Sequence, residues 1–380
     1  MHADLLAITK NEVERWMKMR ARDLGLPFEG ITGKNNAITD VPGVTVGYST
    51  IIEGDGPLKV GEGPIRTGVT AIFPRGKRKE MKPIWAGTYS LNGNGEMTGT
   101  HWINDGGYFL SPICITNTHS VGTVHQTVVK WMVENYSDQF LAEHLWAMPV
   151  VAETYDGVLN DINGFHVKEE HVLAAINSAQ TGKLEEGNVG GGTGMICYEF
   201  KGGTGTSSRK LTIDDEEYHI GVLVQANYGK RDWLNILGVP VGKHLQDNKL
   251  HSREMGSIIV VIGTDIPMLP HQLKRLAKRA AIGISRSGSP GGNDSGDIFI
   301  AFSTANEMDI PQKESAMLNV SYINDQEFDP IYELTCQSID EAVINSMIAA
   351  DRMTTSKPSG KIVEAIPHDK LMEVMRRYNR

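Results

Sequence analysis

The feature that most limits how this chain of 380 residues can fold is an unbroken run of apolar residues from Ile258 to Ile262. Successive side chains of a β-strand point to opposite faces of a sheet, so a strand that is apolar at every position must be covered on both faces. Two more segments, 218–229 and 295–304, contain similar apolar runs. Strands of this kind predict an α/β protein in which helices cover the sheets.

The spacing of apolar residues predicts helices and strands that follow one another without a regular rhythm. Helices are expected at 9–27, 121–136, 171–182, 270–284 and 338–353, and further strands at 38–50, 66–76 and 148–154. The first helix opens on a capping-box pattern at Thr9 and Glu12, and the third is expected to end at Gly182. No repeat, low-complexity tract or linker divides the sequence, so a single domain is expected over 1–380.

Charge and cysteine usage exclude several classes of protein. A net charge of −9 is the opposite of what a nucleic-acid-binding protein needs. No apolar stretch reaches about 18 residues, and charges interrupt the first fifteen residues, so neither a membrane span nor a secretory signal is expected and the cytoplasm is the expected location. Cys114, Cys197 and Cys336 are far apart and are expected to be buried thiols rather than disulfides or zinc ligands.

The dense glycines of 187–210 do not match a nucleotide-binding loop. The segment lacks the Gly-Lys-Ser/Thr ending of a P-loop and the strand-to-helix context of a dinucleotide fingerprint. Glycines here are expected to let backbones approach closely. The histidines show no HExxH spacing either, so neither a cofactor nor a metal is predicted.

A small polar pair, Gly256–Ser257, stands directly before the apolar run. A serine hydroxyl is a weak nucleophile until a base takes its proton, and an α-amine, with a pKa of about 7.7–8, is a suitable base near neutral pH. Ser257 has a free α-amine only if the chain is cut before it. Its hydroxyl can make that cut by attacking the carbonyl carbon of Gly256, where glycine offers the least steric resistance. The pair is consistent with self-cleavage, although a turn before a strand also explains it.

Polar residues also stand at the ends of the other apolar strands. Ser295 and Asp297 are two positions apart, so both are expected on one face, where they could hold the new amine and relay its proton. Asn227 ends the segment 218–227, and Glu153 and Tyr155 end another strand with the same spacing. Polar side chains that gather at the ends of buried strands suggest a catalytic site.

At these residues the sequence resembles a known family over nearly its whole length. The resemblance runs through NNAITDVPGVTVGY, RTGVTAI, NGNGEMTG, ETYDG, NVGGGTGM, FKGGTGTSSR, VQANYG, GSIIVV and NDSGDIF. The chain resembles the L-aminopeptidase/D-esterase and β-aminopeptidase family, whose members are self-processing hydrolases with an N-terminal nucleophile. The resemblance implies a four-layer αββα sandwich, cleavage into a 1–256 α chain and a 257–380 β chain that stay together, and tetramers of these αβ units.

The resemblance also implies roles for single residues. These are Ser257 as nucleophile with its α-amine as base, Ser295 and Asp297 as supports of that amine, Tyr155 and Asn227 as oxyanion donors, and Glu153 as the binder of the substrate's ammonium group. Well-known members have a glutamate where this chain has Asp297. Because aspartate is shorter by one methylene, its contact with the amine is direct, water-bridged or absent.

The expected function is therefore that of an aminopeptidase, with esterase or amidase activity, acting on short peptides, amides or esters that carry a free amine. Two alternatives stay open at this point. Acyl transfer of the ornithine acetyltransferase type uses a similar fold, but with a threonine nucleophile. An unprocessed binding protein without catalytic activity would keep the chain intact.

Overall fold

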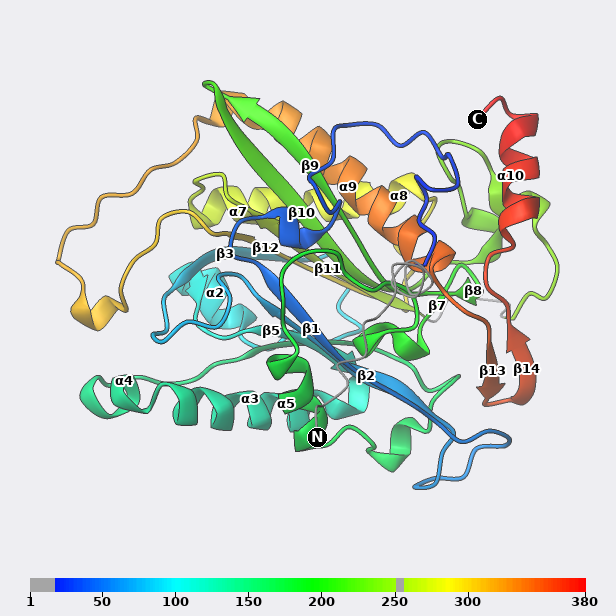
Figure 1. Cartoon of the computed structure of the whole chain (residues 1–380), viewed down its shortest axis with the longest axis horizontal. Helices are drawn as coiled ribbons and strands as arrows, with labels where there is room; N and C mark the ends of the chain where they lie inside the picture. The colour runs from blue at the N-terminus through cyan, green and yellow to red at the C-terminus, as the bar shows by residue number, and fades with distance from the viewer. Residues whose placement is uncertain (1–17, 251–255) are drawn as a thin grey trace, which may run out of the picture.

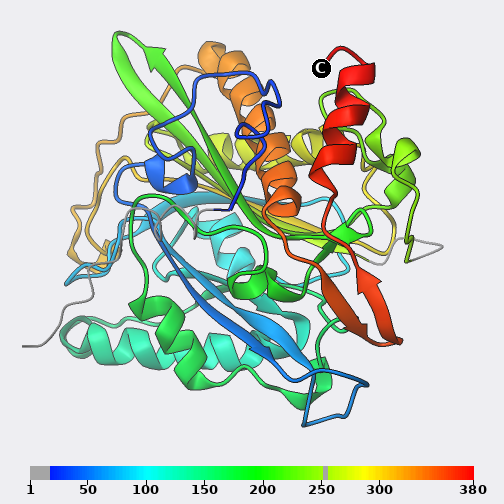
Figure 2. The same cartoon turned by 45° about the vertical axis from the view of Figure 1, so that its right-hand side comes forward.

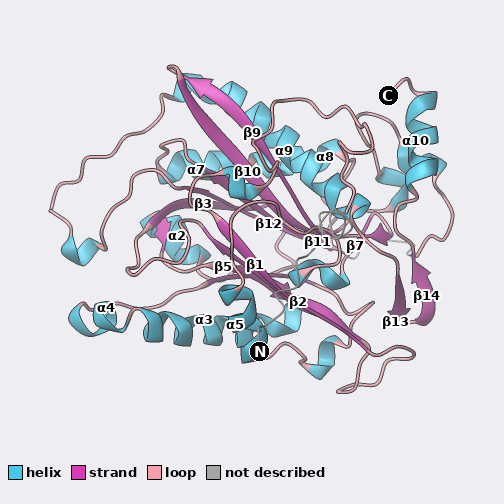
Figure 3. Ribbon diagram, in the orientation of Figure 1, coloured by secondary structure: helices cyan, strands magenta, loops and turns pink. Residues whose placement is uncertain are grey.

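The computed structural model of the chain describes residues 18–250 and 256–380. Figure 1 shows two β-sheets stacked face to face between two layers of helices. This is the four-layer αββα sandwich expected from the sequence, and Figure 3 separates its layers by colour.

The smaller sheet has four strands in the order β1-β2-β5-β6. Their bounds are β1 Thr45–Glu53, β2 Ile65–Phe73, β5 Ile113–Asn117 and β6 Val150–Thr154. Neighbouring strands are antiparallel except β5 and β6, which are parallel. The carboxyl ends of β5 and β6 therefore lie at the same edge of this sheet.

The larger sheet has six strands in the order β4-β3-β12-β11-β10-β9. Their bounds are β3 Ile84–Ser90, β4 Tyr108–Phe109, β9 Gly203–Ile213, β10 Glu216–Asn227, β11 Ser257–Thr264 and β12 Gly296–Ser303. Only β11 and β12 run parallel. Two hairpins complete the strands, β7 Ile196–Cys197 with β8 Phe200–Lys201, and β13 Met353–Ser356 with β14 Ser359–Val363.

Helices cover the outer face of each sheet. Below the smaller sheet in Figure 1 lie α3 Val121–Asn135, α4 Ser137–Ala142 and α5 Glu169–Asn177, and above the larger sheet lie α7 Pro270–Ala277, α8 Arg279–Arg286 and α9 Phe328–Ile348. Three more helices are α2 Thr100–Gly106, α6 Val241–His244 and α10 His368–Arg377. Figure 2 shows α10 and the β13–β14 hairpin to one side of the layers.

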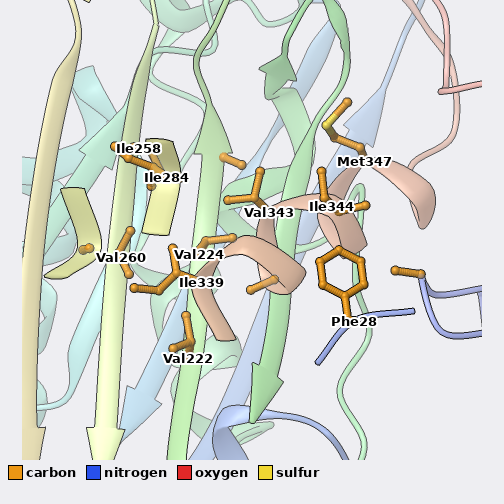
Figure 4. Packing of buried hydrophobic residues seen from close by; sticks show 14 of the residues in the cluster. Phe28, Val222, Val224, Ile258, Val260, Ile284, Ile339, Val343, Ile344 and Met347 are labelled. Carbon is orange, nitrogen blue, oxygen red and sulfur yellow. The ribbon is translucent and has the colours of Figure 1, made fainter. Parts of the chain in front are cut away.

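The strand β11 shows how the sequence fills the interfaces between layers. Ile259 and Val261 belong to the cluster of buried side chains between the two sheets. Ile258 and Val260 face the other way and pack with Ile339 of α9 and its neighbours (Figure 4). Burying one such side chain contributes about 1.5–3 kcal/mol, which explains why a strand between two layers is apolar at every position.

The glycine-rich segment brings backbones together, as expected. Gly190–Gly194 form a short 3-10 helix, η4, that is buried between the smaller sheet and β9. A Cβ atom on Gly192 would lie 2.2 Å from the backbone nitrogen of Thr204. A Cβ atom on Gly205 would lie 2.0 Å from the carbonyl oxygen of Ala342 in α9. These glycines are therefore packing residues.

Some predicted helices differ from the structure. The expected helix at 9–27 falls mainly outside the described residues, and 18–27 form a turn and irregular backbone. The helix expected to end at Gly182 ends at Asn177 instead. The hydroxyl of Ser178 donates to the Tyr48 carbonyl, and Gln180 pairs with β1, so the chain leaves the helix to join the smaller sheet.

The single helix predicted at 270–284 is divided at Lys278 into α7 and α8 because each part packs on a different partner. α7 lies on β3, where a Cβ on Gly87 would be 2.2 Å from the Lys274 nitrogen. α8 lies on α9, where a Cβ on Gly283 would be 2.6 Å from the Cβ of Ile339. The late helix expected at 338–353 has different bounds, because α9 begins earlier, at Phe328, and ends at Ile348, and Met353 begins β13 instead.

Two expectations from composition can be compared with the structure. Cys114, Cys197 and Cys336 are buried, and none of them is in a disulfide within the described part of the chain. None of the helices in residues 18–250 and 256–380 has the length and apolar character needed to cross a membrane.

Candidate active site

Ser257 is the first residue of β11 and lies in the middle of the larger sheet. It is opposite Asn227 of β10 on one side and opposite Gly296 of β12 on the other, and Ile258 is opposite Asp297. Adjacent strands are about 4.8 Å apart, so the register brings Asn227 and the 295–297 segment next to Ser257. The Ser257 side chain is on the same face as Ile259 and Val261, toward the smaller sheet, and the residue is only 4% exposed.

The structure leaves no room for a side chain before the serine. A Cβ on Gly256 would lie 2.1 Å from the carbonyl oxygen of Asn227 and 2.6 Å from the Cα of Tyr228. Because both are backbone atoms, one in the last residue of β10 and one in the residue after it, they cannot move away cheaply. Packing against β10 therefore requires glycine at position 256.

Ser295 and Asp297 form a buried hydrogen-bonded pair. The Ser295 hydroxyl donates to Oδ1 of Asp297 at 2.5 Å, and neither residue is exposed. Asp297 also accepts a hydrogen bond from Nδ2 of Asn92 at 3.2 Å and one from the backbone N–H of Ile258. Burial raises the pKa of Asp297, while these hydrogen bonds act in the opposite direction. The carboxyl group of Asp297 is thus hydrogen-bonded to the backbone of β11 one residue after the serine.

Asn227 connects the two sheets beside the serine. Its Nδ2 donates to the carbonyl oxygen of Tyr155 at 2.9 Å, and its Oδ1 accepts from the Ile196 N–H at 2.8 Å. Two residues earlier on β10, Nε2 of Gln225 donates to the Thr154 hydroxyl at 2.7 Å. The inward side chains of β10 therefore hold the end of β6, and Tyr155 with it, against the larger sheet.

The Tyr155 side chain lies at the protein surface, and its ring packs against Gly157. It is 36% exposed, and burial of the rest raises the pKa of its hydroxyl group. A Cβ on Gly157 would lie 2.3 Å from the Tyr155 hydroxyl oxygen, so that glycine makes room for the ring. The ring is the most accessible part of the predicted set of residues.

Glu153 is a buried carboxylate next to the same strand ends. It is 3% exposed, accepts the backbone N–H of Glu96 at 2.9 Å, and accepts a short hydrogen bond from the Thr118 hydroxyl. Burial raises the pKa of Glu153. A Cβ on Gly95 would lie 3.2 Å from Oε1 of Glu153 and 3.3 Å from the Cα of Gly296. The carboxylate therefore lies near the start of β12, the strand next to Ser257.

Sequence reasoning missed the loop 91–96, which joins these parts. Asn92 donates to Asp297, Nδ2 of Asn94 donates to the Asp294 carbonyl at 2.6 Å, and the Glu96 N–H donates to Glu153. The motif NGNGEMTG covers this loop and carried the only signal, but nothing in it indicates which carboxyl group each residue contacts. Thr118 was missed for the same reason.

The arrangement has the parts of a hydrolytic site. In the described part of the chain, however, the usual kind of side-chain base does not stand beside the serine. Among the described residues, no group of three or more His, Cys, Asp or Glu side chains is placed to hold a metal ion. A hydroxyl at the start of a central strand, two donors from the facing strand ends and buried carboxyl groups suit acyl chemistry on a carbonyl carbon.

The αββα sandwich is the fold of the N-terminal-nucleophile hydrolases, abbreviated Ntn. The chain belongs to peptidase family S58, whose model matches residues 36–360. It is a serine aminopeptidase and hence a peptide-bond hydrolase, as the sequence predicted. The alternatives of an acyltransferase and of a binding protein are therefore set aside.

Three relatives support this assignment. The beta-peptidyl aminopeptidase BapA of Sphingosinicella microcystinivorans is 50% identical over 376 residues, covering 95% of this chain and 93% of that protein. The L-aminopeptidase D-Ala-esterase/amidase of Ochrobactrum anthropi, described as a prototype for the serine aminopeptidases and a new variant of the Ntn hydrolase fold, superposes with a TM-score of 0.91 and is 54% identical, covering 95% of this chain and 99% of that one. A β-aminopeptidase of Burkholderia sp. gives a TM-score of 0.86 at 43% identity, covering 94% and 99%.

Proposed function

We propose that the chain cuts itself between Gly256 and Ser257, and that the resulting β chain uses Ser257 as both nucleophile and base. The Ser257 hydroxyl attacks the carbonyl carbon of Gly256, the peptide bond becomes an ester, and water hydrolyses the ester to give 1–256 with a carboxylate and 257–380 with a free amine. The observation that carries this proposal is the register, in which Ser257 stands between Asn227 and Gly296.

In the proposed turnover, the α-amine takes the proton of the Ser257 hydroxyl as it attacks the substrate's carbonyl carbon. The leaving amine receives that proton, and water then releases the acyl group by the same route. Ser295 and Asp297 support the amine. Because Asp297 already accepts the N–H of Ile258, its carboxylate is close enough to act on the amine electrostatically, whether or not the two are in direct contact.

Two donors are proposed for the oxyanion. An amide NH₂ group has two hydrogens, and one on Asn227 is used by the Tyr155 carbonyl, which leaves the second for the developing negative charge. The Tyr155 hydroxyl is the other donor. Each such donor typically contributes about 3–4 kcal/mol to the transition state.

Glu153 is the proposed binder of the substrate's ammonium group. Its carboxylate is buried and hydrogen-bonded, yet no ion pair to it forms within the described residues. A substrate ammonium would supply the missing positive charge. This requirement accounts for action at a free amino terminus.

The proposed substrates are short peptides, amides or esters with a free amine. The names of two BapA relatives, at 50% and 43% identity, support β-amino acids at the first position of such substrates, and the relative from Ochrobactrum anthropi supports D-alanyl esters and amides. Hydrolysis of matched β-, D- and L-residue amides would rank these classes.

A tetramer of αβ units in the cytoplasm is also proposed. The segment between β12 and α9, which extends far from the layers in Figure 1, carries the exposed apolar side chains of Met317, Leu318 and Tyr322. Apolar side chains gathered on a protruding segment suit a contact between copies of the chain. The three buried cysteines without disulfides suit a reducing compartment. Light scattering would measure the mass of the assembly.

The substitution Ser257→Ala tests the central proposal. The variant is expected to remain a single full-length chain and to lose hydrolysis entirely, because one hydroxyl serves both reactions. Mass spectrometry and turnover of an amino-acid amide are the measurements, and Ser137→Ala, at an exposed position on α4, is the control. Cleavage between 256 and 257 in the Ser257 variant would refute self-processing by this residue.

A further inference from the structure

A buried arginine ties the segment before the proposed cut to the β7–β8 hairpin. Nε of Arg231 donates to the carbonyl oxygen of Tyr198 at 2.9 Å, and Nη2 donates to that of Glu199 at 2.8 Å. Nη1 donates to the carbonyl oxygens of Leu245 at 2.7 Å and Asp247 at 3.0 Å. Arg231 is 1% exposed, so these bonds form largely away from water, where they are stronger than at a surface. The guanidinium therefore fixes the course of the later segment relative to the hairpin.

The side chain of Glu199 holds the end of the described segment 18–250. Its Oε2 accepts the backbone N–H of Leu250 at 2.6 Å, and its Oε1 accepts that of Arg231 at 3.0 Å. Tyr198 and Glu199 form the two-residue turn of the hairpin with φ angles of 50° and 61°, a conformation that favours glycine or asparagine. The contacts of Glu199 give a reason for a carboxylate at a position where the backbone alone would favour glycine.

Leu250 is held by its side chain as well as by its backbone. The side chain packs against a small cluster of buried apolar residues, namely Leu159, Met353 and Val363. Ile196 of β7 packs against the same cluster, and its N–H donates to Oδ1 of Asn227, the residue opposite Ser257. The hairpin that fixes Leu250 through Glu199 is therefore the one that holds Asn227 beside the serine.

Gly256, at the start of the next described segment, is fixed against the same strand end. As described above, it packs on the carbonyl oxygen of Asn227 and on the Cα of Tyr228. The carbonyl oxygen of Tyr228 in turn accepts the N–H of Tyr198 in the hairpin turn at 2.8 Å. Residues 251–255 therefore connect two anchors that both belong to the end of β10 and its hairpin. Fixing both ends of so short a segment limits the positions open to the scissile carbonyl group, which favours attack on it.

We propose that Glu199 and Arg231 are positioning residues for self-cleavage, which hold Leu250 and the segment before it so that the carbonyl carbon of Gly256 stays within reach of the Ser257 hydroxyl. The inference rests on the proposed function, because it takes the bond between Gly256 and Ser257 as the one that is cut. Neither positioning residue has a part in the proposed turnover of substrate. Their loss should therefore slow the cut and leave hydrolysis by the cut enzyme unchanged.

The test measures the two reactions separately in the full chain. Chains made in a pulse of cell-free synthesis are followed on a denaturing gel, and kcat/KM for an amino-acid amide is measured per mole of cut chain. Glu199→Gln can accept only one of its two N–H groups, and Arg231→Lys lacks the planar fork that reaches both segments. Each is expected to slow the cut by roughly tenfold to hundredfold, the effect of losing a buried charged hydrogen bond, and to leave kcat/KM unchanged. Leu250→Ala should slow the cut by a smaller factor.

Glu341→Gln is the matched control, because Glu341 is also a buried carboxylate held by arginine but lies on α9, away from the segment before the cut. At a temperature at which it is folded, this variant should cut itself at the wild-type rate. Equal slowing in Glu341→Gln and Glu199→Gln would show a general effect of instability and would overturn the proposal. A parallel loss of kcat/KM in the Glu199 variant would overturn it too. If Glu199→Gln does not fold, Leu250→Ala at its partly buried position provides the same comparison.

The outcomes separate this inference from the proposed function. A wild-type chain that stays intact, or a Ser257→Ala chain that is still cut, would refute the proposed self-cleavage, and the positioning role with it. If the wild-type chain is cut through Ser257, and the variants at Glu199, Arg231 and Leu250 are cut at the same rate, the proposed function stands and only the positioning role is wrong.

Discussion

Two clusters of buried polar side chains differ in how they compensate the negative charge of a carboxylate. Glu341 of α9 is enclosed, with Nε of Arg22 at 2.9 Å from one oxygen and the Arg209 guanidinium at 2.7 Å from the other. Burial alone would raise the pKa of Glu341, but the hydrogen bond from Arg22 and the two arginine charges lower it. Glu153 and Asp297 are also buried, yet the described residues give neither an ion pair, and burial raises the pKa of both.

The difference distinguishes a structural cluster from a site. At Glu341 the cost of removing the charge from water is offset by fixed cations of the same chain. At Glu153 and Asp297 that cost is met only in part, by hydrogen bonds. A substrate ammonium at Glu153 and the proposed α-amine of Ser257 near Asp297 would complete the compensation. We therefore propose Glu153 as the carboxylate at which a charged ligand binds.

The contrast between the two clusters is tested most directly by a substitution at Glu153. Glu153→Gln is expected to lower kcat/KM for substrates with a free amine by roughly hundredfold to thousandfold, because losing one partner of a buried charge pair costs about 3–5 kcal/mol. The thermal stability of the free enzyme should be unchanged or higher, since an unpaired charge is removed. Kinetics on an amide and on its N-acetyl form, together with a melting curve, measure both effects. Equal turnover of the acetylated form by the wild-type enzyme would exclude Glu153 as the ammonium site.

The reverse result is expected at Glu341. Glu341→Gln should lower the free energy of unfolding by about 3–5 kcal/mol, because Arg209 stays buried without its partner. The lowered pKa means that Glu341 stabilises the fold above the unfolded-state value of about 4.3, and that this contribution is lost as the pH falls through the folded pKa. Urea unfolding of wild type and variant at several pH values measures the difference, which should shrink in acid.

Glu373→Gln is the control for that measurement. Glu373 is in an exposed ion pair with Arg377 on α10, four residues away, and little change in stability is expected. A Glu341 variant as stable as this control would show that the arginines do not depend on the carboxylate.

The smallest effect is expected at Asp297, as a shift in pH rather than a loss. Asp297→Asn removes a negative charge that favours the protonated α-amine, so the lower limb of the kcat/KM profile should move to lower pH. Asp294→Asn, at an exposed position in the turn just before β12, is the control. A limb that does not move would mean that Asp297 has no electrostatic effect on the amine. A wild-type profile that is flat between pH 5 and 9 would refute the α-amine as base.

Sequence reasoning was most successful where one physical effect dominates. The apolar runs of β10, β11 and β12 predicted buried strands because coverage on both faces leaves no polar position. The spacing of Ser295 and Asp297 predicted a shared face, and the structure brings their side chains within hydrogen-bonding distance. The family resemblance supplied the four layers, which periodicity alone did not give.

The remaining features depend on partners that are far away in the sequence. The break at Lys278 follows from two separate packing surfaces, one at Gly87 and one at Gly283. The contacts of Asn92 with Asp297 and of Thr118 with Glu153 join segments that no local pattern connects. Propensity and spacing are local quantities, so they cannot report which distant strand end a polar side chain will meet.

The order of strands in the larger sheet has a consequence for how the proposed mature enzyme could be made again after it unfolds. β11 and β12, which follow the cut, lie between β10 and β3, which precede it. In the intact precursor, refolding is a reaction within one molecule. Once the chain is cut, unfolding frees two polypeptides, and regaining the sheet becomes a bimolecular event whose rate depends on protein concentration. In the precursor, the covalent connection keeps the strands of the larger sheet together while the chain folds. The proposed mature form is therefore assembled once, and it is preserved only by staying folded.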